Sequence, residues 1–186
     1  GFSQTGGQCR ATSYVGMIRK ALIAAGFENV PVVTISTNMQ TLNDQPGFQF
    51  NTKLYMYKAL ISMAFTDALS DMYYSTVVRE KNKGDAKRIA DRYISDFMAG
   101  RIPTEKKALL HARGRAVDEF NAVEVDDREY PKVGIVGEIY VKFNAFSNNH
   151  AAEWLIDQGI EVVMPSFLEF FAGGVIHVNQ KVMTNI

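Results

Sequence analysis

The chain has 186 residues, of which 47% are hydrophobic and 22% charged, the composition of a globular domain able to bury a core. Its 20 basic and 20 acidic residues cancel, so no overall field attracts nucleic acid or an anionic membrane, and no apolar run approaches the roughly 20 residues that cross a bilayer. A single cysteine forms no internal disulfide, which predicts a reducing compartment, the cytoplasm. The length predicts one domain, residues 1–186, with two small lobes as the alternative. Because the sequence starts at Gly1 without an initiator Met, we expect it to be excised from a longer protein.

The first predicted element is an amphipathic helix that follows Cys9. Apolar residues recur there at helical spacing from Tyr14 onward, and Gly26 is placed to end the helix. Thr12 or Ser13 is placed to cap its start. A β-branched run at 32–36 then predicts a buried strand, and a polar loop follows through 43–47.

A helical section is predicted over about 52–125. Its first helix, 52–78, is apolar on more than one side and is therefore expected to be central. Two further helices are expected at 85–98 and 104–123, the first ended by Gly100 and Pro103. Their charges are mixed in sign, which is typical of solvated helix faces. The polar turn at 126–129 is the expected seam with the rest of the chain.

A strand-helix-strand unit is predicted over about 131–165. The apolar run 132–141 indicates a parallel strand covered on both faces, and 160–164 indicates a second strand. Asn148 or Asn149 is placed to cap the helix between them. The predicted fold class is therefore α/β, a Rossmann-like parallel sheet with a long helical section inserted between early and late strands.

Two places in the sequence are candidates for chemistry. Cys9 follows two glycines and precedes a helix, a setting that suits a reactive thiol or a metal-cluster ligand, although an inert core thiol is the commoner role of a lone cysteine. Gly137 and Glu138 lie near the carboxyl end of the predicted strand, where ligands of open α/β sheets collect. There Asn148 and Asn149 can supply neutral hydrogen bonds, or the same residues can serve only packing and capping.

Several catalytic signatures are absent from the sequence. There is no phosphate-binding loop of the P-loop type, no Gly-x-Ser-x-Gly elbow, no His-Glu-x-x-His helix and no complete dinucleotide fingerprint. The histidines, His111, His150 and His177, lack the spacing of metal ligands. We therefore expect neither a mononuclear metal site nor a nicotinamide cofactor.

Two segments carry a family resemblance: 7–22, which contains Cys9 and Arg10, and 131–143 together with Asn148 and Asn149. They resemble the carboxyl-terminal region of the large activase-related proteins of the 2-hydroxyacyl-CoA dehydratase and benzoyl-CoA reductase system. The resemblance implies radical chemistry on CoA thioesters, driven by an activase that carries a [4Fe-4S] cluster. It further implies that Cys9 falls on a family cysteine able to ligate a cluster, the alternative being a scaffold region in which Cys9 has another role. Since such a cluster needs about four thiolates, this chain is not expected to hold one alone.

The leading functional prediction is a dehydratase-like segment that helps to form an iron–sulfur or CoA-thioester site in a larger assembly. Its site residues would be Cys9, Arg10, Gly137 and Glu138 with the Asn pair, and its partner the rest of the full-length protein or an activase or dehydratase subunit. The alternative is a non-catalytic interaction module, in which apolar residues near Tyr55 stay exposed on the long helices and drive dimerisation. A third hypothesis is a self-contained enzyme with Glu138 as general base.

Overall fold

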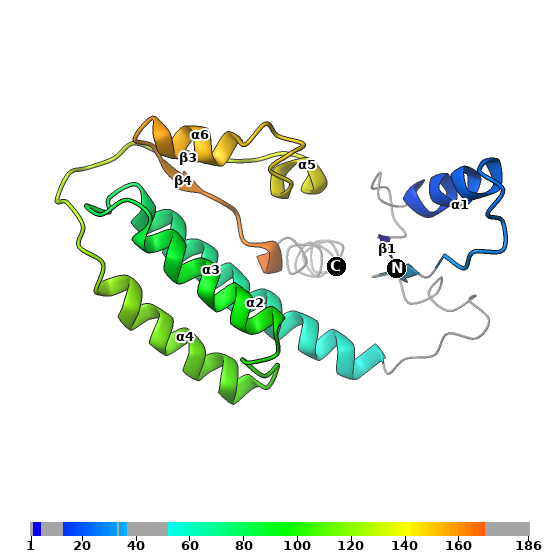
Figure 1. Ribbon diagram of the computed structural model, residues 1–186, viewed down its shortest axis with the longest axis horizontal. Coiled ribbons are helices and arrows are strands. Elements are labelled where there is room, and N and C mark those ends of the chain that lie inside the picture. The colour runs from blue at the N-terminus through cyan, green and yellow to red at the C-terminus, as the bar shows by residue number, and fades with distance from the viewer. Residues whose placement is uncertain (1, 5–12, 33, 37–51, 170–186) are drawn as a thin grey trace, which may run out of the picture. The chain divides into compact units, whose positions relative to one another are not determined.

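The computed structural model describes residues 2–4, 13–32, 34–36 and 52–169, which belong to two compact units, 1–51 and 52–186. Each unit is described by itself. In the first, strand β1 (Phe2–Gln4) pairs in parallel with strand β2 (Thr34–Ser36), and helix α1 (Tyr14–Ala24) lies between them in sequence (Figure 1). The helix and the strand at 34–36 confirm the prediction, whereas β1 was not predicted. Ser13 stands at the N-cap position of α1, but its side chain forms no capping hydrogen bond, and Thr12 lies outside the described residues.

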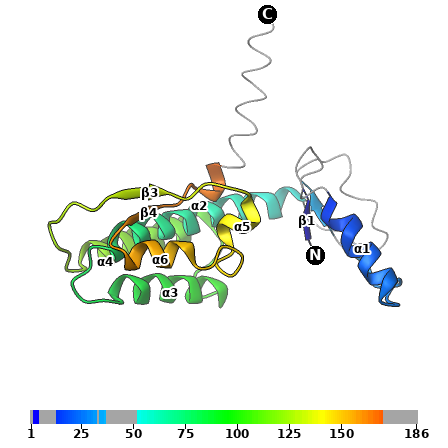
Figure 2. The ribbon, with the colours of Figure 1, turned by 90° about the horizontal axis from the view of Figure 1, so that it is seen from above.

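Three helices form the body of the second unit. Helices α2 (Thr52–Val77), α3 (Asp85–Met98) and α4 (Lys106–Asn121) run side by side in Figures 1 and 2. All three were predicted, within two residues at each end. Helix α2 packs against both other helices and against the late strand, as its apolar surface on several sides led us to expect.

The core of this unit lies between the three helices. Phe65 and Leu69 of α2 are almost completely buried, and the Phe65 ring packs 5.7 Å from that of Phe97. Burial of one such side chain stabilises the fold by about 1.5–3 kcal/mol. The other buried members come from all three helices and from the loop before α4: Val77, Ala86, Ile89, Tyr93, Ile102, Leu109, Ala112, Ala116 and Phe120. This shared core fixes the helices that support the late strands.

The later part of the second unit contains strand β3 (Lys132–Gly134), helices α5 (Ile139–Phe143) and α6 (Ala151–Asp157), and strand β4 (Glu161–Val163). The strands pair in parallel, with Lys132 beside Glu161 and Gly134 beside Val163. The strand-helix-strand order is therefore confirmed. Over the described residues the protein is mostly helical with small two-stranded parallel sheets, and the Rossmann-like sheet stays a prediction.

The prediction of one covered strand over 132–141 is wrong. The strand ends at Gly134, all three of its residues are exposed, and the last part of the run is helical. A largely apolar run does not distinguish a covered strand from a short strand followed by a helix, because the local pattern is the same. The turn at Gly137 and Glu138 decides between them.

Candidate functional site

The turn at Gly137 and Glu138 connects β3 to α5. Gly137 has a φ of +151°, which residues with a Cβ rarely adopt. Apart from its chain neighbours, no atom of the described residues lies within 4 Å of the position that a Cβ would occupy. Glycine is therefore required here for its backbone conformation, and the space beside it is open.

Glu138 uses its two carboxylate oxygens differently. It is the N-cap residue of α5, and its Oε2 accepts a hydrogen bond from the Val141 N–H at 3.0 Å. Its Oε1 is buried and has no hydrogen-bond partner among the described residues. Because a buried acceptor without a partner costs about 1–3 kcal/mol, a ligand or partner donor that reached this atom after a movement of the side chain would relieve that cost.

Asn148 joins the end of α5 to the start of α6. Its Nδ2 donates to the carbonyl oxygens of Val141 at 3.0 Å and Lys142 at 3.1 Å, and its Oδ1 accepts from the Ala151 N–H at 3.2 Å. The capping prediction is thus confirmed for Asn148. Asn149 is exposed and has a φ of +54°. The N-cap residue of α6 is His150.

Glu138 and Asn148 therefore come together at one short helix. Both side chains bond the backbone of Val141, Glu138 to its N–H and Asn148 to its carbonyl oxygen. The polar atoms of Asn148 already have partners, so the unpaired acceptor of this group is Glu138 Oε1. The ligand-binding roles of Gly137, Asn148 and Asn149 stay predictions.

Cys9 and Arg10 lie outside the described residues, and so does His177. The hypothesis that Cys9 and Glu138 line one site therefore stays a prediction. Of the other histidines, His111 and His150 are both exposed.

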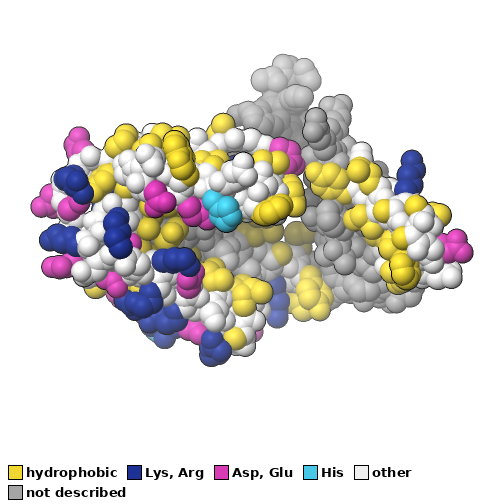
Figure 3. All heavy atoms as spheres, turned by 45° about the horizontal axis from the view of Figure 1, so that its top comes forward, with side chains coloured by type: hydrophobic (Ala, Val, Ile, Leu, Met, Phe, Trp, Pro, Cys, Tyr) yellow, Lys and Arg dark blue, Asp and Glu magenta, His cyan; other side chains and the backbone are white. Residues whose placement is uncertain are grey.

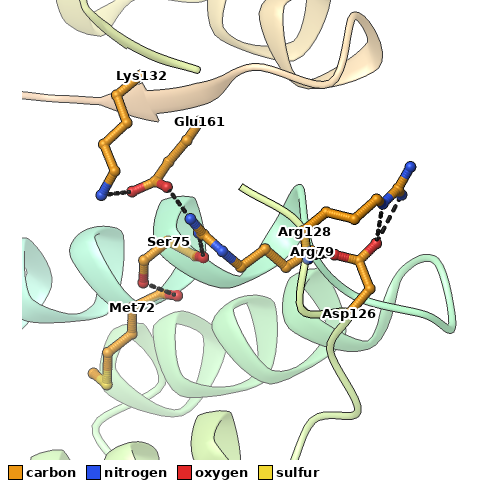
Figure 4. A network of polar contacts seen from close by, with 7 residues as sticks. All are labelled: Met72, Ser75, Arg79, Asp126, Arg128, Lys132 and Glu161. Carbon is orange, nitrogen blue, oxygen red and sulfur yellow. Dashed lines mark hydrogen bonds and ion pairs between the residues drawn. The ribbon is translucent and has the colours of Figure 1, made fainter. Parts of the chain in front are cut away.

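An ionic network that the sequence did not reveal joins the late strands to α2 (Figure 4). The side chain of Glu161 is 7% exposed and bonds Lys132 Nζ at 2.9 Å and the guanidinium of Arg79. Arg79 also donates to the Ser75 carbonyl oxygen at 2.7 Å. Burial acts to raise the pKa of Glu161, but hydrogen bonds from Lys132 and Arg79, with their charges, hold that pKa below its ordinary value.

Tyr130 extends this network toward the loop before β3. The Arg79 guanidinium lies 5.6 Å from the centre of the Tyr130 ring, and the Tyr130 hydroxyl donates to Asp126 Oδ2 at 2.7 Å. Hydrogen bonds from Tyr130 and then Arg128 hold the pKa of Asp126 below its ordinary value. The polar turn expected as a seam thus ties the helices to β3.

Two other acidic side chains cap helices from a distance. Buried Glu80 accepts hydrogen bonds from the N–H groups of Gly84 and Ala86, both at 2.7 Å, at the start of α3. Asp67 of α2 accepts from the Ser166 hydroxyl at 2.7 Å and from the Leu168 N–H at 2.8 Å, at the start of the helical residues 167–169. Carboxylates at helix N-termini satisfy free donors and complement the helix dipole, so these residues are structural.

The residues present do not fit a complete [4Fe-4S] site. The chain supplies one cysteine, whereas a cubane cluster needs about four thiolates. Within the described residues, no group of three or more His, Cys, Asp or Glu side chains is placed to hold a metal ion. In the same part of the chain, no helix combines the length and apolar character that a membrane span requires.

Comparison with protein-family models, with curated proteins and with solved structures gave no match.

Proposed function

We propose that this chain is a dehydratase-like segment of an activase-related protein. It would supply one wall of a CoA-thioester or iron–sulfur site in a larger cytoplasmic assembly and would not be catalytic by itself. The proposal starts from the sequence resemblance of 7–22 and 131–143, and it includes a Rossmann-like sheet in the complete protein.

The observation that carries the ligand-binding part is the buried, unpaired Oε1 of Glu138. The open space beside Gly137 would let a ligand approach the same turn. A carboxylate oxygen accepts hydrogen bonds from N–H and O–H groups and repels phosphates. If a CoA thioester binds here, the amide N–H groups of its pantetheine arm would therefore face Glu138, and its phosphates would lie elsewhere.

The iron–sulfur part depends on Cys9. One thiolate cannot hold a cluster, so the other ligands would come from flanking sequence or from a partner subunit. Anaerobic iron–sulfur reconstitution of the full-length protein and of its Cys9→Ala variant tests this part. We expect lower cluster content and an altered EPR signal in the variant. Unchanged cluster content would remove Cys9 from the ligands.

Titration of the chain with coenzyme A, followed by amide NMR shifts, tests the CoA part. Glu138→Gln is the decisive variant, because glutamine can still accept from the Val141 N–H while an amide donor replaces the free Oε1. We expect at least tenfold weaker binding, since a hydrogen bond to a charged group contributes about 1.5–3 kcal/mol. Glu153→Gln, on the exposed side of α6, is the matched control. Equal binding by both variants, or no shift at all, would refute CoA binding at Glu138.

A second candidate function is a non-catalytic interaction module. It is favoured by α2, where the side chains of Tyr55 and Met56 are 57% and 38% exposed while Met63 and Met72 are half-buried. Large exposed apolar side chains close together on one helix are typical of interaction surfaces. Sedimentation of the chain and of a Met56→Ser variant tests it. A wild-type chain that stays monomeric at all concentrations would refute dimerisation through α2.

A further inference from the structure

The exposed face of α4 combines apolar and basic side chains in one stripe. Its buried face consists of Leu109, Ala112, Ala116 and Phe120. On the exposed side, Leu110 and Val117 are 46% and 40% accessible and stand seven residues apart. Lys106 and Arg113 complete a series with spacings of four, three and four, which follows one line along a helix.

The two basic residues of this stripe, Lys106 and Arg113, form no ion pair in the described part of the chain. Arg115, on another side of the helix, interacts electrostatically with Glu119. The basic residues of the neighbouring α3 differ, because Lys87, Arg88 and Arg92 each bond an Asp or Glu. Figure 3 shows Lys and Arg side chains on the second unit with Asp and Glu side chains among them. The stripe of α4 therefore carries two positive charges that no ion pair among the described residues compensates.

We propose that the stripe formed by Lys106, Leu110, Arg113 and Val117 docks an acidic amphipathic helix of a partner protein. Apolar side chains of that helix would cover Leu110 and Val117, and its Asp or Glu side chains would pair with Lys106 and Arg113. A stripe with spacings of four and three matches the seam along which two helices pack. The proposal rests on the second candidate function and specifies a partner surface and its chemistry.

A protein helix fits this face better than nucleic acid or a lipid surface. The chain has no net charge, so it does not attract nucleic acid as a whole. Asp118 and Glu119 lie in the last turn of α4 and would repel the phosphates of an extended strand at that end. The stripe offers two apolar side chains, whereas helices that insert into membranes present a whole apolar face. A helix that presents Leu and Glu in turn along one of its faces complements both the apolar and the basic side chains of the stripe.

The test uses a synthetic helical peptide with Leu and Glu along one stripe and Ala and Gln elsewhere, and a matched peptide in which Lys replaces Glu. Binding to the complete chain is followed by amide NMR shifts and fluorescence anisotropy at low and high salt. One variant combines Lys106→Glu with Arg113→Glu, and a second variant carries Leu110→Ser alone. Lys83→Glu is the control, an exposed lysine outside α4 with no ion pair among the described residues. Circular dichroism verifies that each variant is folded.

We expect the acidic peptide to shift amides of α4 and the basic peptide to shift none. The double charge reversal should weaken binding about tenfold, because two attractions become repulsions, and high salt should weaken it similarly. Absence of binding, shifts outside α4, or equal affinity in the Lys83→Glu and double variants would overturn the proposal. Tighter binding of oligothymidylate or of phosphatidylserine vesicles to the same residues would also overturn it. None of these outcomes bears on dimerisation through α2, which sedimentation measures separately.

Discussion

Replacing Glu161 by glutamine should destabilise the protein by about 2–3 kcal/mol. Removal of one member of a buried ion pair typically costs about 3–5 kcal/mol, because the other charge is left without a partner. The cost is lower here because Lys132 is 61% exposed and solvent screens its charge, and because Arg79 keeps its bond to the Ser75 carbonyl. Glu153→Gln, at an exposed carboxylate, should change stability by less than about 0.5 kcal/mol.

The assay is urea unfolding monitored by circular dichroism. The urea concentration at half unfolding is compared between wild type and variants that share the same m-value. The pKa of Glu161 is lowered in the folded state, so its contribution is complete above its unfolded value of about 4.3. It is lost as pH falls through the lower, folded pKa. The difference between wild type and variant should therefore stay constant from about pH 7 to pH 5 and shrink in stronger acid. A variant as stable as Glu153→Gln at neutral pH would refute the role of Glu161 as an anchor.

Three other substitutions test the local geometry. Glu80→Ala removes the acceptor of two N–H groups at the start of α3, and should lower the free energy of unfolding by about 1–2 kcal/mol in urea. Gly137→Ala forces an unfavourable φ without a steric clash, and should cost about 1–3 kcal/mol and speed amide exchange in α5. Asn148→Ala breaks three hydrogen bonds, and should lower the melting temperature and accelerate exchange at the start of α6. Wild-type exchange rates in the last two variants would contradict the geometry described.

The helices were predictable because their signals are local. The pattern over 85–98 gave the bounds of α3, and Gly100 has the positive φ that ends such a helix. The run 132–141 failed because an apolar sequence fits both strand and helix, and the choice depends on how one glutamate caps a turn. The sequence indicated Gly137 and Glu138 as a candidate site, but it placed them at the end of a strand, whereas Glu138 is the N-cap residue of α5.

The anchor at Glu161 could not be predicted in the same way. It depends on the pairing of β3 with β4, which places Lys132 beside Glu161, and on the approach of Arg79 from the turn after α2, 82 positions earlier. One signal was present in the sequence, a single charged residue inside the apolar run 160–164. Such a charge near a buried strand requires a partner, but sequence spacing does not say which residue supplies it.

Glu138 and Glu161 belong to the same strand-helix-strand unit, and their environments assign them opposite roles. Both oxygens of Glu161 are bonded to cations, whereas one buried oxygen of Glu138 has no partner among the described residues. Glu138→Gln keeps an acceptor for Val141 and removes an unpaired charge, at the expense of a helix-dipole interaction of about 0.3–1 kcal/mol. We expect its stability in urea to differ from wild type by less than about 1 kcal/mol. If Glu138→Gln lost as much stability as Glu161→Gln, the carboxylate would be a structural cap, and its availability to a ligand would be refuted.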